Sequence, residues 1–478
     1  MHHHTDVAVI GAGTAGLAAY RAARQRGARA VIIEGGVGGT TCARVGCMPS
    51  KLLIAAAEAA HAISAAPGFG VHGGPVRVDG KAVMKRVRDE RDRFVGFVRR
   101  GVDQIPAEDK LYGTARFVDT HTLAVGEDVV SAKAVVIATG SRATWPRHFE
   151  AVGDRLIIND DVFSWQDLPE SVAVFGPGVI GLELGQALAR LGVRVRVFGR
   201  GGAVGPLTDP LVRDRFLAAI SEELYVDPDA RVRDLKRVGD AVSVTFTDLD
   251  GAERTETYDW LLAATGRTPN VEGLGLEAAG VVLGTAGVPV SDPRTTQCGA
   301  APVFIAGDAA NYIPLLHEAA DEGRIAGDNA ARLALGETMV HGERRARLGV
   351  VFTDPQIAMA GASFRSLRPD CYVIGEVSFD DQGRSRVMRK NKGHLRVYGE
   401  IATGRFLGAE MAGPAAEHIG HLLAWSVQSG LTVDEMLARP FYHPVVEEGL
   451  RTALRDLAAK LAAHPKDRAP CPDCTPGT

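Results

Sequence analysis

A glycine-rich pattern that occurs twice constrains the fold of this chain more than any other feature. The first copy is DVAVIGAGTAG at residues 6–16, and the second is SVAVFGPGVIG at residues 171–181. Each is an apolar run that ends in GxGxxG, and the glycines are Gly11, Gly13, Gly16, Gly176, Gly178 and Gly181. An apolar run that stops at closely spaced glycines predicts a buried strand turning sharply into a helix. We therefore expect two α/β units of the same kind.

The first unit continues as a dinucleotide-binding fold would. A helical stretch at 17–25 follows the glycines, and a second strand at 30–33 ends on Glu34. In such folds the first two glycines let the backbone turn and approach a pyrophosphate, and the third lets the helix pack close to the strand. The helix N-terminus stabilises the phosphate charge, and Glu34 can accept hydrogen bonds from a ribose hydroxyl.

The second unit ends differently. Its helix runs through Leu191, and the strand at 193–198 is followed by Gly199 and Arg200, where the first unit has Glu34. The missing carboxylate removes repulsion from a 2′-phosphate, and Arg200 can neutralise one. Two such units suggest one resident flavin dinucleotide and one exchanging nicotinamide dinucleotide, and this strand end favours NADP(H) over NAD(H). The alternative is that Arg200 is a solvated loop residue that contacts no coenzyme.

Two cysteines, Cys42 and Cys47, follow the first unit in the segment GTTCARVGCMPSK at residues 39–51. In an ideal helix, residues five apart have Cα atoms roughly 8 to 9 Å apart. A disulfide needs a Cα separation below about 7 Å, so a straight helix could not carry it. Gly46 gives the backbone the freedom for an irregular turn, and Pro49 suits the first position of a following helix.

The helix predicted after this turn, at 50–62, is rich in alanine and leucine. Cys47 would lie at its N-terminus near Lys51, where the helix dipole and the ammonium group stabilise a thiolate. Closely spaced cysteine pairs in a reducing compartment are more often catalytic or metal-binding than structural. The segment therefore predicts a working thiol pair.

These segments resemble the pyridine nucleotide-disulfide oxidoreductases, a family that includes dihydrolipoyl dehydrogenase, glutathione reductase and mercuric reductase. The family's redox motif reads GGTCxxxGCxPSK, and Thr40 replaces one glycine here; because Gly39 remains beside it, we expect the change to be tolerated. The other matching segments are ATGS at 138–141, ATGRTPN at 264–270, FIAGDA at 304–309 and FTDP at 352–355. The resemblance covers nearly the whole chain.

The resemblance assigns roles to individual residues. Cys42 would be the interchange thiol that attacks the substrate, and Cys47 the charge-transfer thiol against the flavin of FAD. Lys51 would lie near the flavin and pair with Glu183, while Asp308 would bind the ribityl chain. The expected cofactor-binding residues are Gly11, Gly13, Gly16, Glu34, Thr41, Lys51, Thr139, Gly140, Gly176, Gly178, Gly181, Arg200, Gly266 and Asp308.

Thiol exchange needs a base, because the thiolate is the nucleophile and the leaving sulfur must receive a proton. Among fourteen histidines, His443 is set apart by the segment PFYHPVVEE at 440–448. The family pattern is HPxxxE, in which the histidine is the base and the glutamate orients it. His443 and Glu448 match that spacing, whereas Glu447 occupies a place often held by serine. The alternative is an ordinary loop histidine between prolines.

In this family the base enters the disulfide site of the other subunit, so the resemblance implies a homodimer with two composite sites. The residues themselves show two apolar helical candidates near the C-terminus, at 419–427 and 450–461. These helices could bury an interface or pack within one subunit.

The fold class expected is α/β, with two Rossmann-like dinucleotide-binding domains and an α+β C-terminal dimerisation domain. The FAD-binding domain spans 1–145 and is completed by a central part at 266–340. The NAD(P)-binding domain spans 146–265, and the interface domain spans 341–464. A flexible tail at 465–478 carries a CxxC motif.

The composition excludes several other classes. A net charge of −4 over 478 residues gives no reason to expect nucleic acid or an anionic membrane surface as a partner. No run of about twenty uncharged apolar residues exists to span a bilayer, so we expect a cytoplasmic protein. Six cysteines are too few for a disulfide-stapled scaffold of this length, and Cys298 and Cys371 are expected to be buried small hydrophobes. His2, His3 and His4 are left out of the predicted fold.

The substrate is expected to be a dithiol or disulfide, and the HPxxxE block favours dihydrolipoamide, which a lipoyl domain could present. An alternative is a mercuric or thioredoxin-type reductase that uses the arm carrying Cys471 and Cys474. That pair could equally form half of a zinc site or be inert. Glutathione reductase is disfavoured, because the positively charged glutathione contacts near the redox motif have no counterpart at residues 35–37. A non-catalytic complex subunit or redox sensor is the alternative outside enzymes.

Overall fold

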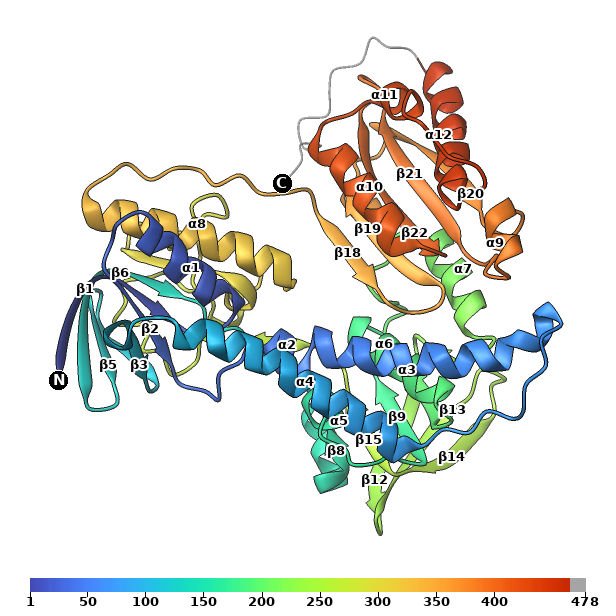
Figure 1. Ribbon diagram of the computed structural model, residues 1–478, viewed down its shortest axis with the longest axis horizontal. Coiled ribbons are helices and arrows are strands. Elements are labelled where there is room, and N and C mark those ends of the chain that lie inside the picture. The colour runs from blue at the N-terminus through green and yellow to red at the C-terminus, as the bar shows by residue number, and fades with distance from the viewer. Residues whose placement is uncertain (465–478) are drawn as a thin grey trace. The chain divides into compact units, whose positions relative to one another are not determined.

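The computed structural model describes residues 1–464 and divides the chain into two compact units, which we describe separately (Figure 1). The first unit combines Met1–Leu52, Lys85–Thr144 and Gly266–Arg344. The second combines Leu53–Met84 and Trp145–Thr265 with the chain from Arg345 onward. The nicotinamide-binding and interface domains expected from the sequence therefore share one unit, and their separation stays a prediction. The expected tail at 465–478 lies outside the described residues.

A seven-stranded sheet forms the centre of the first unit. Its order is β3-β2-β1-β6-β5-β4, and β17 also pairs with β6. Strands β1, β2, β6 and β17 run parallel, as expected for an α/β unit. The strands of this unit are β1 (His2–Ile10), β2 (Ala30–Glu34), β3 (Lys110–Tyr112), β4 (Ala115–Asp119), β5 (Thr122–Val125), β6 (Asp128–Ile137), β7 (Ser141–Ala143), β16 (Arg267–Pro269) and β17 (Val303–Ile305).

Strand β1 begins at His2 rather than at Val7, so leaving the histidine run out of the predicted fold is wrong. His2, His3 and His4 continue the parallel ladder with β6 beyond the part of β1 that pairs with β2. The ring of His2 also lies 2.9 Å from the hydroxyl of Ser131. The histidines extend the strand because the backbone hydrogen bonds of β6 would otherwise end at an open edge.

Two helices, α1 (Thr14–Gln25) and α8 (Leu316–Leu335), cover one face of this sheet (Figure 1). They approach closely because α8 carries Gly323 and Gly327, where any Cβ would overlap the carbonyl oxygens of Ala15 and Ala19 on α1. Alanine and valine side chains of α1, α8, β1 and β6 fill the layer between helices and sheet. The tight packing fixes the start of α1, where the first glycine pattern lies.

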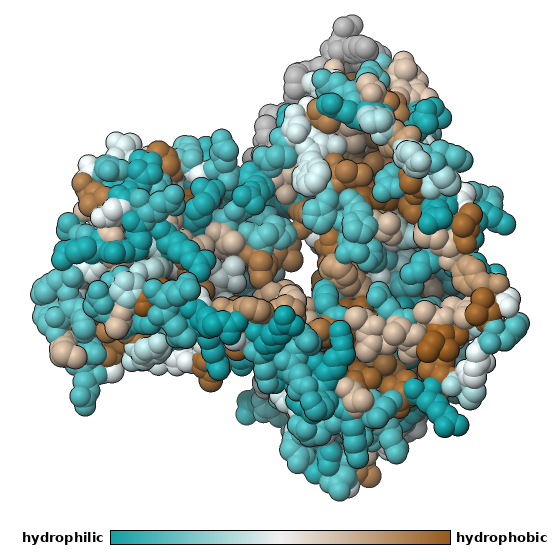
Figure 2. Space-filling model, viewed as in Figure 1, coloured by the Kyte–Doolittle hydropathy of each residue, from teal (hydrophilic) through white to brown (hydrophobic). Residues whose placement is uncertain are grey.

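The redox segment forms two helices, α2 (Thr41–Val45) and α3 (Cys47–Ala65). The second helix begins earlier than predicted, so Pro49 stands at its third position and not at its first. Proline is tolerated there because the amide groups of the first turn lack partners within the helix. Helix α4 (Gly80–Asp103) runs alongside α3, and Arg86 donates to the carbonyl of Leu52 over 3.3 Å. The face of α4 turned to the viewer is hydrophilic (Figure 2).

The segment 41–69 is the one described helical stretch that is long and apolar enough to cross a membrane by length and composition. It begins with the two cysteines of the redox motif. Its far end carries Glu58 and His61, which line a charged cavity of the second unit. We therefore interpret the segment as the helix that follows the redox motif.

The second unit contains a parallel sheet of order β11-β10-β9-β15-β8 beside an antiparallel sheet of order β12-β13-β14. Aromatic side chains, including Phe175, Phe198, Phe246 and Tyr258, pack between the two sheets. The elements are β8 (Leu156–Ile157), α5 (Asn159–Val162), β9 (Ser171–Phe175), α6 (Val179–Arg190), β10 (Arg194–Phe198), α7 (Pro210–Ile220), β11 (Tyr225–Asp227), β12 (Arg231–Val238), β13 (Ala241–Thr247), β14 (Glu253–Tyr258) and β15 (Trp260–Ala263).

The C-terminal part of the second unit is an antiparallel sheet of order β18-β19-β22-β21-β20 with helices packed on it. Its elements are β18 (Leu348–Val351), β19 (Gln356–Gly361), β20 (Tyr372–Ser378), α9 (Gly383–Val387), β21 (His394–Glu400), β22 (Phe406–Gly413), α10 (Ala416–Gln428), α11 (Val433–Leu437) and α12 (Glu447–Ala462). The two predicted apolar helices correspond to α10 and α12. Their buried residues pack on their own sheet, while Trp425 of α10 is 64% exposed.

The two cysteines outside the motifs, Cys298 and Cys371, differ in burial. Cys298 is buried in the core of the first unit, and burial raises the pKa of its thiol to about 12. Cys371 is half-buried, so the expectation that it is a core residue is wrong. It lies at a bend directly before β20.

Candidate redox and dinucleotide sites

The two cysteines of the redox motif meet because the helix breaks between them. Gly46 adopts φ −125° and ψ −119°, which ends α2, and α3 begins at the next residue. A Cβ at Gly46 would lie 3.1 Å from the carbonyl oxygen of Thr41 and 3.2 Å from the Cα of Cys42, so a side chain there would crowd this approach. The side chains of Cys42 and Cys47 are hydrogen-bonded to each other, and both cysteines are free thiols here. The predicted irregular turn is confirmed.

The protonation of the pair is asymmetric. The hydrogen bond with Cys47, then burial, then the negative charge of Cys47 raise the pKa of the Cys42 thiol. Cys47 is exposed and stands at the first residue of the 19-residue helix α3, whose dipole stabilises an anion. The raised pKa favours a proton on Cys42, and Cys47 occupies the position at which the helix dipole would stabilise a thiolate. A thiol that holds its proton needs a separate base before it can act as a nucleophile.

Thr40, just before the pair, has a backbone conformation that glycine would adopt freely. Its φ is +57° and its ψ is +146°, and Gly39 also has a positive φ of +89°. Gly39 therefore does not supply the freedom that a glycine would have at position 40, and the expectation that the change is tolerated stays a prediction. A β-branched residue with positive φ is strained. The side-chain oxygen of Thr40 accepts the amide of Ala43 over 3.3 Å, which caps α2.

Lys51 and Glu183, which the family resemblance pairs, lie in different units. The ammonium of Lys51 is 3.5 Å from the hydroxyl of Ser50, and that hydroxyl donates to the carbonyl of Cys47. Glu183 is buried on α6 and accepts the amide of Phe352 over 3.0 Å. The pairing of Lys51 with Glu183 stays a prediction.

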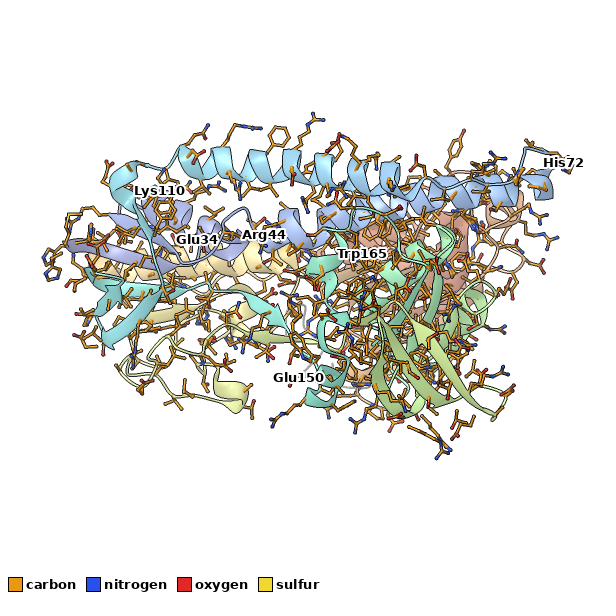
Figure 3. The ribbon with its side chains drawn as sticks, turned by 90° about the horizontal axis from the view of Figure 1, so that it is seen from below. Glu34, Arg44, His72, Lys110, Glu150 and Trp165 are labelled. Carbon is orange, nitrogen blue, oxygen red and sulfur yellow. The ribbon has the colours of Figure 1, made fainter. Side chains whose placement is uncertain are left out.

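The first glycine turn has the shape that a dinucleotide phosphate requires. Gly11 has a φ of +104°, and a Cβ there would overlap the carbonyl of Ala138, while the space beside Gly13 is open. Glu34, labelled at the end of β2 in Figure 3, accepts the amide of Ala12 over 3.0 Å. The carboxylate expected at the ribose therefore also holds the glycine turn in place.

The other expected FAD contacts gather within the first unit at the ends of β6 and β17. The hydroxyl of Ser141 donates to Asp308 over 2.6 Å, and Arg267 donates to the same hydroxyl over 2.8 Å. The hydroxyl of Thr139 is buried and has no hydrogen-bond partner among residues 1–464. Gly140 and Gly266 have φ angles of +71° and +138°. Thr41 is exposed at the start of α2.

These observations together fit a flavin dinucleotide. An open glycine turn, the N-terminus of α1 and an unpartnered buried hydroxyl at Thr139 are the groups that a pyrophosphate and a polar ligand chain require. Asp308 supplies a carboxylate at the end of the same sheet.

The second glycine turn repeats the first in detail. Gly176 has a φ of +109°, and a Cβ there would overlap the carbonyl of Ala264, as Gly11 does with Ala138. The third glycine, Gly181, packs against the carbonyl of Gly176 in the way that Gly16 packs against that of Gly11. The space beside Gly178 is open. Arg200 is exposed and forms no hydrogen bond or ion pair with the part of the chain that the structure describes.

The expected acid–base pair is present in the second unit. Nδ1 of His443 lies 3.0 Å from Oε1 of Glu448, and the side chain of His443 is 81% exposed. The hydrogen bond with His443 holds the pKa of Glu448 below its usual value. The amide of Val445 also donates to Glu448, which fixes the carboxylate against the loop. Glu447 forms no hydrogen bond or ion pair with His443, so Glu448 is the carboxylate that holds the ring.

The structure describes two partial sites, one in each unit. The cysteine pair lies in the first unit, and the histidine–glutamate pair lies in the second.

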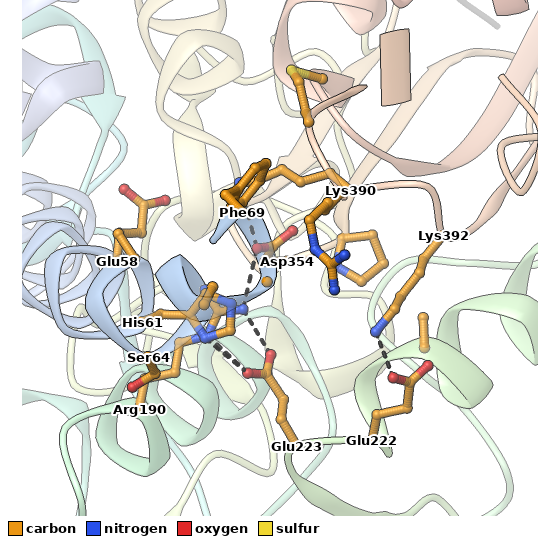
Figure 4. A pocket seen from close by; sticks show the side chains of 17 residues that line it. Glu58, His61, Ser64, Phe69, Arg190, Glu222, Glu223, Asp354, Lys390 and Lys392 are labelled. Carbon is orange, nitrogen blue, oxygen red and sulfur yellow. Dashed lines mark hydrogen bonds and ion pairs between the residues drawn. The ribbon is translucent and has the colours of Figure 1, made fainter. Parts of the chain in front are cut away.

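A cavity of about 820 Å³ in the second unit was not foreseen from the sequence (Figure 4). At its base, Arg190 of α6 bridges Glu223 over 2.8 Å and Asp354 over 3.1 Å. His61 of α3 lies 3.6 Å from Glu223. Burial and the charge of Arg190 lower the pKa of His61. These residues come from segments far apart in the chain, so no local sequence pattern could have found them.

Comparisons with known proteins agree with this architecture. Residues 5–323 match the family model of pyridine nucleotide-disulphide oxidoreductases, and residues 348–454 match the dimerisation domain of the same family. A mercuric reductase of Streptomyces lividans is 32% identical over 482 residues, covering 96% of this chain and 98% of that protein. A dihydrolipoyl dehydrogenase of Haloferax volcanii is 29% identical over 480 residues, covering 97% of this chain and 98% of that protein.

Solved structures show the same fold. The crystal structure of LpdA from Mycobacterium tuberculosis matches with a TM-score of 0.78 at 24% identity, covering 94% of this chain and 99% of that one. The HOCl-induced flavoprotein disulfide reductase RclA from Escherichia coli matches with the same TM-score at 21% identity, covering 95% of this chain and 99% of that one. The glycine turns and the cysteine pair agree with the family models. The chain belongs to the pyridine nucleotide-disulphide oxidoreductase family of FAD- and NAD(P)-dependent enzymes.

Proposed function

We propose that this flavoprotein disulfide oxidoreductase passes electrons between a dithiol substrate and NAD(P)(H) through Cys42 and Cys47, with dihydrolipoamide as the substrate. The single observation that carries the proposal is that the break at Gly46 brings the side chains of Cys42 and Cys47 together, with Cys47 at the first residue of α3. Two cysteines in different surroundings can divide the work between a thiol that meets the substrate and a thiol whose thiolate the helix N-terminus stabilises.

In dithiol oxidation His443 accepts the proton of the first substrate thiol at Nε2, because Nδ1 is held by Glu448. The substrate thiolate attacks the sulfur of Cys42 in the Cys42–Cys47 disulfide, and Cys47 leaves as a thiolate at the N-terminus of α3. The second substrate thiolate then attacks the substrate sulfur bound to Cys42. Cys42 leaves and takes up a proton, as its raised pKa favours.

FAD, when bound at the first glycine turn, supplies the two-electron carrier between the cysteine pair and the nicotinamide. The residues that would hold it are the glycine turn of β1 and α1, Glu34, Thr139 and Asp308. The residues that would hold the nicotinamide coenzyme are the second glycine turn and Arg200, which supports NADP(H). A cytoplasmic location stays a prediction.

The dimerisation domain supports a homodimer in which His443 serves the cysteine pair of the partner subunit. In this domain a cavity of about 520 Å³ is lined by apolar side chains around Trp425 and Tyr442. Tyr442 is 79% exposed and directly precedes His443. An exposed apolar surface beside the proposed base is what a second subunit would cover.

Reduction of Hg(II) is the second candidate, because a mercuric reductase is among the relatives of at least 30% identity. The cysteines that such a reaction would use in the arm, Cys471 and Cys474, lie outside the described residues. The experiment compares NAD(P)⁺-dependent oxidation of dihydrolipoamide with NADPH oxidation driven by Hg(II) and by oxidised thioredoxin. Turnover with dihydrolipoamide at least tenfold above the others supports the proposal, and the reverse order contradicts it.

Glu448→Gln and Glu447→Gln form a matched pair for the same assay. We expect the first to lose most dithiol turnover, since a neutral amide holds His443 less firmly than a carboxylate does. The second should remain within about twofold of wild type, because the half-buried carboxylate of Glu447 forms no hydrogen bond or ion pair with the described residues. Equal losses of dithiol turnover in both variants would show that turnover depends on the start of α12 as a whole and not on the hydrogen bond between His443 and Glu448.

A further inference from the structure

The end of β10 is closed by the neighbouring strand β11. The two strands are parallel, and Phe198 pairs with Asp227 at the last position of each. The amide of Gly199 donates to the carbonyl of Asp227 over 2.6 Å, and the amide of Ala230 donates to the carbonyl of Gly199 over 3.1 Å. The segment after β11 therefore crosses the end of β10, where a dinucleotide fold places its ribose-binding acid.

No side chain can stand at Gly199. A Cβ there would lie 2.5 Å from the carbonyl oxygen of Pro228 and 2.7 Å from the carbonyl carbon and the Cα of the same residue. All three atoms belong to the backbone, which cannot move aside as a side chain would. The usual acid position is therefore filled by Pro228.

A different carboxylate stands on this loop. Oδ1 of Asp229 accepts the amide of Gly201 over 2.7 Å, and the amide of Gly202 donates to the carbonyl of Pro228 over 3.0 Å. Asp229 is exposed, and its Oδ2 accepts no hydrogen bond from the described residues. Asp227 is buried instead, and its Oδ1 accepts the amide of Asp229 over 3.0 Å, so Asp229 is the exposed acid of this segment.

The loop that Asp229 touches also touches the second glycine turn. The amide of Gly205 donates to the carbonyl of Pro177, which lies between Gly176 and Gly178, over 2.7 Å. Arg200 belongs to the same loop and forms no ion pair. The loop at 199–205 therefore carries one cation, Arg200, and contacts one acid, Asp229, beside the turn that would hold a coenzyme pyrophosphate.

We propose that Asp229 takes the place of the strand-end acid and selects the coenzyme in opposition to Arg200. The inference rests on the proposed use of NAD(P)(H) by the second fold. The carboxylate of Asp229 accepts a hydrogen bond from a ribose hydroxyl and repels a 2′-phosphate, whereas Arg200 attracts that phosphate. The ratio of NADPH to NADH use is then set by the balance of these two charges.

The test uses the FAD-loaded protein and three variants. Asp229→Asn keeps an acceptor for the amide of Gly201 but removes the charge, and Arg200→Ala removes the cation. Asp240→Asn is the matched control, because it makes the same charge change on the exposed turn between β12 and β13. For each protein the dissociation constants of adenosine 2′,5′-bisphosphate and 5′-AMP are measured by calorimetry, and flavin reduction is followed with limiting NADPH and NADH.

We expect Asp229→Asn to raise the preference for the 2′-phosphorylated ligand by about five- to twentyfold, and Arg200→Ala to lower it by a similar factor. Both shifts should shrink as salt is raised, because the groups are exposed. Asp240→Asn should stay within twofold of wild type. A preference unchanged in Asp229→Asn overturns the proposal, as does a wild-type protein that binds neither nucleotide. Loss of dithiol turnover with nucleotide binding intact would count against the proposed function alone.

Discussion

Nδ1 of His443 lies 3.0 Å from Oε1 and 3.1 Å from Oε2 of Glu448. Because the acid engages Nδ1, the proton at that nitrogen is fixed and Nε2 remains as the acceptor for a thiol proton. The same acid accepts the amide of Val445, so the ring and the loop are held by one carboxylate.

We predict that His443→Gln loses about a hundred- to ten-thousandfold in dithiol turnover, as expected for loss of a general base. Flavin reduction by the nicotinamide should survive, because that half-reaction does not need the base. Stopped-flow measurement of the two half-reactions checks this. His421→Gln, on the exposed face of α10, is the matched control. Equal loss of both half-reactions would mean that His443 has a structural role.

Purified protein should be yellow, and Cys42→Ser should show a long-wavelength absorption band without any reductant. The reason is that Cys47 can no longer form a disulfide and keeps its thiolate at the N-terminus of α3. Absorption spectra of wild type, Cys42→Ser and Cys371→Ser give the comparison. The last variant removes a free thiol outside the motif and should match wild type. A colourless, flavin-free wild type would contradict the FAD assignment.

Thr40→Gly should raise the melting temperature of the FAD-loaded protein by about 1 to 3 °C, because glycine relieves roughly 1 kcal/mol of backbone strain. The lost cap on α2 offsets only a few tenths of a kcal/mol of this gain. Thr40→Ala is the control, since it loses the cap and keeps a Cβ at positive φ. It should melt below wild type. A lower melting temperature in both variants would show that the cap outweighs the strain.

We predict that His61 contributes to a loss of folding stability as the pH falls from 7.5 to 5.5. Its pKa is lowered in the folded state by burial and by Arg190, so the unfolded chain binds the proton more readily. The stability that neutral His61 contributes is present above the unfolded pKa of about 6.5 and is lost as pH falls below it. His61→Gln should therefore reduce the drop in melting temperature between pH 7.5 and pH 5.5, by about 1 to 2 °C. An unchanged drop would contradict this linkage.

The sequence predicts those parts of the fold that are determined by the residues of one short segment. The two glycine turns follow from residue identity, because Gly11 and Gly176 occupy backbone conformations and contacts that exclude a side chain. The break at Gly46 is predicted for the same reason. The histidine–glutamate pair is predicted through the family pattern, and its hydrogen bond follows from the short loop and the start of α12.

Other features depend on contacts that no single segment encodes. The first strand starts at His2 because the residues from His2 onward pair with the backbone of β6. The composition of the histidine run does not indicate this pairing. Thr40 has a positive φ because the loop geometry imposes it against the preference of the residue. The cluster around Arg190 joins α3, α6, the residues after α7 and the start of β19, so its members show no common pattern in the chain.

The contact between Gly199 and Pro228 has a consequence for how this enzyme could evolve. In a relative with open space at that position, one codon change could install a carboxylate and alter coenzyme use. Here such a change would drive the new Cβ into the backbone of Pro228. A lineage carrying this sequence must first rebuild the segment after β11, and the intermediate steps would disturb the sheet. Directed evolution toward a new coenzyme should therefore begin at residues 227–230 and not at the glycine.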